Sequence, residues 1–199
     1  MAPQRKAFPL LFLPRAEPFR LLCDKVFLRP PERGDYEDWA SLRARSRDFL
    51  TPWEPSWPPD ALSRASFRAR LTRYAEDWRT DQGYNFFVFR ADERLAGGIG
   101  LSNIRRGVAE TASLGYWIGQ PFARRGMMSA ALPLVLDFAF NRLRLHRIEA
   151  ACLPHNDGSR AVLLRTGFEQ EGYARRYLQI DGKWQDHLLF AILREVWKS

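Results

Sequence analysis

The sequence predicts a mixed α/β domain built on a central, mostly antiparallel sheet with helices on both faces. Three short runs rich in apolar residues, at 84–90, 94–104 and 111–118, follow one another across brief turns, which is typical of an antiparallel meander. A helical pattern from 126 to 140 then leads to an apolar strand at 146–153. Because a crossover helix separates these last two strands, we expect them to run parallel.

The first part of the chain is expected to supply an extension, one strand and two helices. Residues 1–24 are rich in proline and predict an extension laid over the surface, which leaves 25–195 as the domain. Val26–Leu28 is the expected first strand. Residues 35–49 show an amphipathic helical pattern, and 61–80 predict a second helix whose arginines spread over its exposed face.

Leu50–Pro59 lies between these helices and contains four prolines, which exclude a helix or a central strand. Its two tryptophans, Trp53 and Trp57, need an apolar surface on which to pack. Two interpretations are open. In one, the tryptophans fasten a surface loop to the core; in the other, the segment forms a rigid wall over the substrate entrance.

Two features are expected to disturb the regular elements. Gly97, Gly98 and Gly100 thin the strand at 94–104, which indicates a bulge or a close approach of another backbone. Pro133 lies inside the helical pattern, where it removes one hydrogen bond and costs about 3 kcal/mol unless a bend absorbs the change. We therefore expect a bend at Pro133.

The C-terminal part predicts one short helix and a hairpin. Residues 157–166 have a helical pattern that ends at Gly167, as helices commonly end at glycine. Asp181-Gly182 separates the strands expected at 177–180 and 183–192, and this dipeptide favours a tight hairpin turn.

The composition is strongly basic. The formal net charge is +8, and only four of the 31 basic residues are lysines. Such a balance suits an anionic partner, either a phosphorylated cofactor or an RNA-rich surface such as the ribosome. The alternative is that the arginines simply cover solvated helix faces.

The sequence also predicts a cytoplasmic protein without a membrane partner. Cys23 and Cys152 form no spaced pair and no metal signature, which is typical of a reducing compartment. The apolar stretch 8–13 is bounded and interrupted by prolines and is not followed by a cleavage site, so it does not fit a signal peptide. No apolar run reaches membrane-spanning length.

The stretch Gly115–Ala131 (GYWIGQPFARRGMMSAA) is the most informative part of the sequence. A short strand, Tyr116–Ile118, feeds a helix that begins at Gly126. The unpaired N–H groups and the dipole at such a helix start favour a phosphate group, and Arg124 and Arg125 add charged donors beside it. Many joints of this kind bind nothing, so this stretch alone leaves both interpretations open.

A second motif lies about thirty residues downstream. Asn156 and Ser159 are followed by Gly167-Phe168, eleven residues after Asn156. The two spaced motifs together resemble the GNAT superfamily of acyl-CoA-dependent N-acetyltransferases. The segment 50–55 and the tail 171–187 resemble its RimJ-like branch, which acetylates ribosomal-protein alanine. Ala123, Met128 and Ala130 depart from the usual residues of the family's phosphate loop and helix.

The resemblance implies a single GNAT-type domain in which the fourth and fifth strands, here 111–118 and 146–153, splay apart to admit acetyl-CoA, with no metal. The residues implied in cofactor binding are Tyr116, Trp117, Ile118, Arg124, Arg125, Gly126, Met127, Met128, Ser129 and Asn156. Those implied on the substrate side are Trp53, Glu54 and Tyr173. Asn156 alternatively caps the helix that follows it.

Three residues are candidates for proton transfer. Many members of the family have a tyrosine that acts as the general acid where this chain has Leu163. Ser159 is then the best candidate to protonate the departing thiolate, and the alternative is that it only caps a helix. Glu149 and Glu110 are candidate general bases, unless they are solvated surface charges. An N-terminal amine has a pKa near 7.7–8.0, so only a weak general base is needed to remove its proton.

The leading hypothesis is therefore acetyl transfer to an α-amino group, with the N-terminal alanine of a ribosomal protein as the acceptor that the resemblance implies. One alternative is an acetyltransferase that acts on a small amine, such as an antibiotic or a polyamine. The other is a non-catalytic module that binds acyl-CoA or RNA. The sequence leaves a monomer and a dimer equally open.

Overall fold

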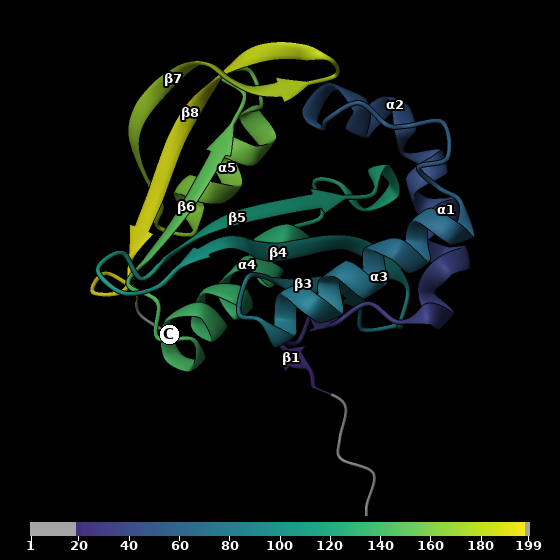
Figure 1. The fold of residues 1–199 in the computed structure, drawn as a ribbon, viewed down its shortest axis with the longest axis horizontal. Coiled ribbons are helices and arrows are strands. Elements are labelled where there is room, and N and C mark those ends of the chain that lie inside the picture. Colours follow the sequence, from purple (N-terminus) through teal and green to yellow (C-terminus); the bar gives the residue numbers. More distant parts are fainter. Residues whose placement is uncertain (1–18, 198–199) are drawn as a thin grey trace, which may run out of the picture.

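The computed structural model describes residues 19–197, which form one eight-stranded sheet flanked by helices (Figure 1). The strand order is β1-β2-β3-β4-β5-β6-β8-β7. The strands are β1 (Leu21–Leu22), β2 (Val26–Arg29), β3 (Tyr84–Arg90), β4 (Leu95–Arg105), β5 (Thr111–Ile118), β6 (Arg147–Cys152), β7 (Glu169–Ile180) and β8 (Lys183–Leu193). The helices are α1 (Tyr36–Arg45), α2 (Arg47–Leu50), α3 (Arg64–Arg79), α4 (Met127–Asp137) and α5 (Asp157–Arg165). The predicted mixed fold is confirmed.

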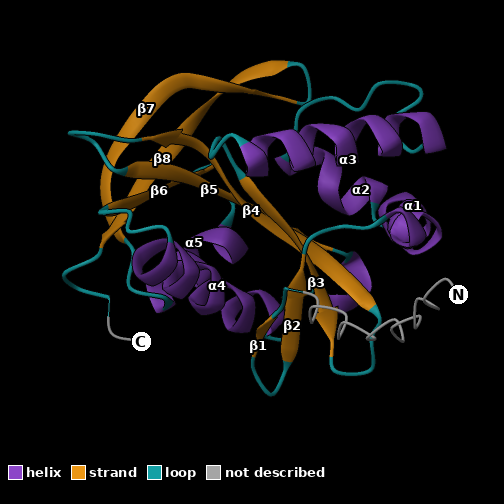
Figure 2. Ribbon diagram, turned by 60° about the horizontal axis from the view of Figure 1, so that its bottom comes forward, coloured by secondary structure: helices purple, strands orange, loops and turns teal. Residues whose placement is uncertain are grey.

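Helices cover both faces of the sheet, as predicted (Figure 2). Successive residues of a strand point to opposite faces, and two neighbours on β3 show both layers. Phe87 packs against Phe67 of α3, with ring centroids 6.4 Å apart, whereas Phe86 meets Phe138 at the end of α4, at 5.5 Å. The apolar core therefore lies on both faces of the sheet, and strands β3 to β5 form the layer between its two parts.

The sheet is antiparallel except at one pair. β5 and β6 run parallel and pair over three positions only, from Thr111↔Arg147 to Ser113↔Glu149. β5 then continues to Ile118 and β6 to Cys152 without pairing further, so the two strands diverge (Figure 1). These are the fourth and fifth strands of the prediction, because β1 adds an edge strand within the expected extension 1–24. Residues 1–18 of that extension lie outside the described residues.

The predicted helix 35–49 is two helices, because the chain breaks at Ser46. This serine is fully buried, and its hydroxyl accepts a hydrogen bond from the backbone N–H of Gln120 at 2.9 Å. The break thus ties the first helical layer to the turn that follows β5. The predicted helix 61–80 begins at Arg64, where Ser63 caps it by accepting from Ser66 N–H at 3.0 Å.

Three other elements differ in detail from the prediction. α4 runs through Pro133 as an α-helix, and its geometry changes only at Phe138–Arg142, which is π-helical. β7 begins at Glu169 instead of Tyr177, because its outward residues are polar and hide the strand pattern. The hairpin is consequently a long curved arm that arches toward α2 (Figure 1). No helix within residues 19–197 combines the length and apolar composition needed to cross a membrane.

The β4 glycines allow the close backbone approach that the sequence indicated. A Cβ on Gly97 would lie 2.3 Å from the carbonyl oxygen of Trp117 on β5, and one on Gly98 would lie 2.4 Å from its indole nitrogen. Gly115, on β5 itself, has open space in its Cβ direction. β4 is therefore built from glycine so that Trp117 can lie over it.

Gly97→Ala is expected to lower the free energy of unfolding by about 1–3 kcal/mol, because the added methyl meets backbone that cannot move aside. Gly115→Ala is the matched control. It places the same methyl on the neighbouring strand, in open space, and is expected to leave stability unchanged or slightly higher. Urea denaturation followed by circular dichroism measures both, and equal effects of the two changes would contradict this account.

Candidate active site

A cleft of about 900 Å³ lies where β5 and β6 diverge. Its walls come from five segments that are distant in sequence. They are residues 49–54, the end of β5 at 114–118, the start of α4 at 122–129, residues 150–165 around the end of β6 and α5, and His187 on β8. The cleft thus joins both motifs of the sequence with the tryptophan-rich segment.

Most of the predicted cofactor residues meet along this cleft. Its lining includes Tyr116, Trp117, Ile118, Arg124, Gly126, Met127, Met128, Ser129 and Asn156. Arg125 does not line it, and its side chain is exposed. On the substrate side Trp53 and Glu54 line the cleft, whereas Tyr173 does not.

The start of α4 has the geometry of an anion cradle. Gly126 adopts the left-handed conformation, with φ of +70°, at the position that caps α4. A Cβ on this residue would lie 3.0 Å from the ammonium nitrogen of Lys25, which precedes β2. Lys25 therefore adds a cation to the positive end of the helix, where Arg124 also lines the cleft. Sequence reasoning missed Lys25, since no local motif links it to α4.

The cleft also carries a pair of hydroxyl groups. The phenol of Tyr116 and the hydroxyl of Ser159 are hydrogen-bonded at 2.7 Å. Burial raises the pKa of the Tyr116 phenol well above its usual range, so this group stays protonated at neutral pH. Asn156 caps α5 by accepting from the backbone N–H of Ser159 at 3.0 Å, which leaves the Ser159 hydroxyl free for Tyr116.

A thiol lies beside this pair. Cys152, at the end of β6, lines the cleft and is buried, and burial raises the pKa of its thiol against the opposing effects of Ser159 and Arg160. Its sulfhydryl thus remains protonated at neutral pH. The cleft therefore holds two groups that carry a proton at neutral pH, the Tyr116 phenol and the Cys152 thiol.

The tryptophan-rich segment forms a wall of the cleft. The two carboxylate oxygens of Glu54 accept hydrogen bonds from the guanidinium of Arg43, at 2.8 and 2.6 Å, and one also accepts from Trp57 Nε1 at 2.9 Å. The same guanidinium lies over the Trp57 ring, 4.2 Å from its centroid. The backbone oxygen of Glu54 accepts from Asp181 N–H at 2.9 Å, which joins the wall to the tip of the hairpin.

The two predicted general bases lie outside the cleft. Glu110 precedes β5 at the end remote from α4 and accepts hydrogen bonds from Arg106 Nη1 at 3.1 Å and from Gly107 N–H at 2.9 Å. The carboxylate of Glu149 lies 2.9 Å from Arg147 and 3.4 Å from Arg105. Neither carboxylate is among the residues that line the cleft, and their catalytic role stays a prediction.

Tyr173 is also held elsewhere. Its hydroxyl donates to Asp186 at 2.5 Å, and its ring is half exposed on β7. Among residues 19–197, no three histidine, cysteine, aspartate or glutamate side chains gather closely enough to hold a metal ion.

Comparison with known proteins identifies the family. Residues 25–169 match the family model described as Acetyltransferase (GNAT) domain. This chain belongs to the GNAT acetyltransferase family. It is accordingly an acyltransferase.

Several relatives span nearly the whole chain. The probable N-acetyltransferase YjcK of Bacillus subtilis strain 168 is 40% identical over 169 residues, which cover 84% of this chain and 93% of the relative. The ribosomal protein uS5-alanine N-acetyltransferase of Escherichia coli strain K12 is 36% identical over 179 residues, or 89% and 92% of the two chains. A solved structure of Mycobacterium smegmatis RimJ in complex with CoA-disulfide is similar, with a TM-score of 0.83 at 35% identity over 87% of this chain and 85% of that one.

The residues of this GNAT domain fit acetyl-CoA, the co-substrate of the family. Beyond Ser113, the edge of β5 that faces the gap has no β6 partner, so an extended pantetheine arm can pair there with the backbone of Tyr116–Ile118. A diphosphate fits the cradle at Gly126, a position that a Cβ would begin to fill. Lys25 and Arg124 are the cations that would flank it.

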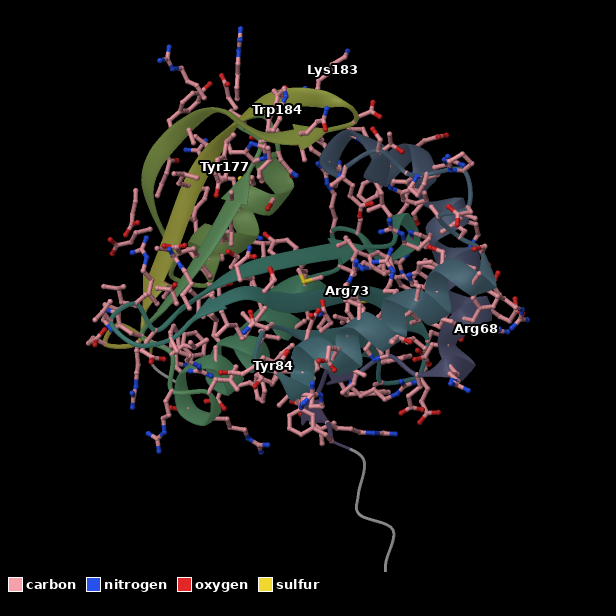
Figure 3. All side chains as sticks on the ribbon, viewed as in Figure 1. Arg68, Arg73, Tyr84, Tyr177, Lys183 and Trp184 are labelled. Atoms are coloured by element: carbon pink, nitrogen blue, oxygen red, sulfur yellow. The ribbon has the colours of Figure 1, made fainter. Side chains whose placement is uncertain are left out.

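Lys25→Met is expected to weaken the binding of CoA about tenfold, because a charged hydrogen bond to phosphate is lost. The weakening should shrink as salt is raised, since salt screens the lost attraction. Isothermal titration calorimetry with CoA at two ionic strengths measures this. Lys183→Met, at the tip of the hairpin (Figure 3), removes the same charge far from α4 and should leave the dissociation constant unchanged. Equal affinities for both variants would exclude Lys25 from the cradle.

Proposed function

We propose that this protein transfers an acetyl group from acetyl-CoA to the N-terminal α-amine of a protein, and that the acceptor is the N-terminal alanine of a ribosomal protein. The wedge between β5 and β6 carries the proposal, because it runs from the phosphate cradle at Gly126 to the hydroxyl pair of Tyr116 and Ser159. A thioester that enters along this path ends beside groups that can protonate its sulfur. The similarity to the uS5-alanine acetyltransferase supports the choice of acceptor.

The geometry supports direct transfer without a covalent enzyme intermediate. The neutral amine attacks the thioester carbonyl carbon, a carbon–nitrogen bond forms, and the carbon–sulfur bond breaks. An N–H of the unpaired β5 edge polarises the carbonyl oxygen as negative charge develops on it. The departing thiolate takes a proton from the Tyr116 phenol, and Ser159 relays a replacement from the solvent side.

The charges around the cleft favour an α-amine over a polyamine. Within the described part of the chain, the carboxylates that line the cleft are Glu54 and Asp157. Glu54 is occupied by Arg43, and Asp157 is exposed at the start of α5. A polycation would need uncompensated negative charge. An α-amine needs none, since roughly a tenth of it is neutral at pH 7, against well under a thousandth for a lysine side chain.

Incubation with acetyl-CoA and peptides that begin with Ala, Ser or Met is expected to release free thiol fastest with the Ala peptide. The Ala peptide with a blocked N-terminus is the matched control, and it should release none even when it contains an internal lysine. Spermidine and an aminoglycoside extend the panel to small amines. Release with small amines alone would refute the proposed acceptor, and tight CoA binding with no release from any amine would indicate a non-catalytic module.

Tyr116→Phe is expected to lower kcat about 10²-fold while the dissociation constant of CoA stays unchanged, because the backbone edge remains and only the proton donor is lost. Ser159→Ala should lower kcat less, by about tenfold. Because Asn156 caps the backbone N–H of Ser159, the alanine variant keeps the cap and isolates the role of the hydroxyl. Steady-state thiol release with calorimetric CoA binding separates the two effects. Wild-type kcat in the double variant would remove both residues from the mechanism.

A further inference from the structure

We propose that His187 accepts the proton of the attacking amine and is therefore a catalytic residue of this acetyltransferase. The inference rests on the proposed function, because it concerns the same cleft. His187 lies on β8, is only 3% exposed, and lines the cleft. Neither motif of the sequence includes it. The proposed role follows from the two ring nitrogens, because one of them is hydrogen-bonded and the other is not.

The hydrogen bonding of the ring fixes its tautomer. Nδ1 of His187 lies 3.0 Å from the backbone oxygen of Gln185. A carbonyl oxygen can only accept, so Nδ1 carries the proton and Nε2 of the neutral ring carries the lone pair. Within residues 19–197, no hydrogen bond is made to Nε2 of His187. Nε2 is also not one of the side-chain nitrogen and oxygen atoms that are fully buried without a hydrogen-bond partner. The basic nitrogen is therefore open toward the cleft.

The ring is held in this orientation from a second side. The ring of Tyr177 on β7 meets it edge to face, with centroids 5.8 Å apart. Tyr177 lies on the arched hairpin, below Lys183 and Trp184 (Figure 3). A backbone hydrogen bond and an aromatic contact together leave the imidazole little freedom, and this is the preorganisation that proton transfer requires.

His187 lines the cleft from the face of the sheet opposite Cys152. In the register of β6 and β8, Leu188 pairs with Cys152, so His187 lies one residue beyond the end of β6. Cys152 is the residue whose thiol adjoins Ser159, and Ser159 is bonded to Tyr116. The proposed donor for the thiolate, Tyr116 on β5, and the proposed acceptor for the amine proton, His187 on β8, thus line the same cleft.

The other groups around this part of the cleft serve less well as the base. Glu54 is bound by Arg43, and Asp186, next to His187, is bound by Tyr173 and by the backbone N–H of Arg176. His155 is exposed against Trp53. The titratable or charged groups that line the cleft with His187 are Tyr116 on β5, Arg124 before α4, Cys152 on β6, His155, Asp157 and Arg165 around α5, and Glu54, which is paired with Arg43. Tyr177 on β7 contacts the ring, and Asp186 precedes His187 on β8.

The proton balance closes with this assignment. The amine nitrogen forms its bond to the acetyl carbon and loses one proton to Nε2 of His187. The thiolate that leaves gains one proton through Tyr116 and Ser159. His187 then returns its proton to solvent, so the net products are the acetylated amine and the free thiol of CoA.

The dependence of kcat/KM on pH tests the proposal. In wild type, both the acceptor amine and His187 must be unprotonated, so log(kcat/KM) should approach a slope of two on the acid side. His187→Asn keeps a donor for the Gln185 oxygen and removes the basic nitrogen. It is expected to lower kcat/KM about 10²-fold and to reduce the acid slope to one, because only the amine then titrates. A purely structural role would lower the rate without changing the slope.

Further variants keep the test decisive if His187→Asn proves unstable. His187→Ala is expected to regain activity in added imidazole, which can occupy the vacated space and accept the proton. His146→Gln is the matched control, because His146 is exposed and pairs with Glu195 outside the cleft; its profile should equal that of wild type. Thermal melts check the fold of each variant, and CoA titrations check its cofactor affinity.

The outcomes separate this inference from the proposed function. The profile is measured with whichever acceptor of the peptide and small-amine panel supports thiol release. Wild-type rate and slope in His187→Asn would overturn the role of His187 and leave the proposed function intact. Release with small amines alone would overturn the peptide acceptor, while a slope of one in the variant would still support His187. No release with any acceptor would overturn both.

Discussion

The divergence of β5 from β6 after Ser113 is the constraint on which the rest of the structure depends. Apart from an irregularity opposite Ala112, each strand stays paired on its outer side, β5 with β4 as far as Ile118 and β6 with β8 as far as Cys152. On the inner side, both strands leave backbone donors and acceptors without a strand partner. Unpaired backbone is costly when it is buried, so the gap must be filled by solvent or by an extended ligand. The outer pairings therefore keep the inner backbone edges of β5 and β6 apart, and these unpaired edges favour an extended, strand-like substrate. The binding site thus depends first on the pairing of the sheet and only then on individual side chains.

The walls of the gap are held by contacts between segments that are far apart in sequence. The buried hydroxyl of Ser46 binds the turn after β5, and Arg43 fixes the tryptophan-rich segment through Glu54. The tip of the β7–β8 arm reaches the same segment through Asp181. The helix break thus fixes the turn after β5, while Arg43 and Asp181 fix the tryptophan-rich segment on another wall of the cleft. These contacts explain why the segment 50–59 forms a fixed wall of the cleft. They also show that Glu54 holds this segment in place, so its carboxylate is not available to bind an incoming amine.

The sequence predicted what depends on local patterns and on two spaced motifs. The meander, the parallel pair, the helix start at Gly126 and the cap at Asn156 all lie where local periodicity and turn chemistry placed them. What it could not predict depends on pairs of residues brought together only by the fold. The break at Ser46 needs Gln120, the start of α4 gains Lys25 from the turn before β2, about a hundred residues earlier, and the hydroxyl of Ser159 gains a phenol from β5. The early start of β7 was hidden because an exposed edge strand has no apolar alternation to read.

The excess of arginine offers a physical reason why an imidazole suits this cleft better than a carboxylate. Glu54, Glu110 and Glu149 each accept hydrogen bonds from guanidinium groups, which hold these carboxylates in ion pairs. A chain that carries 31 basic against 23 acidic residues tends to neutralise any acid near its sheet in this way. A neutral histidine attracts no guanidinium, and its second nitrogen can be satisfied by the backbone of its own strand. The many arginines that suit an anionic partner thus also pair with carboxylates and so favour an imidazole as the base. His187 is the buried imidazole that lines the cleft.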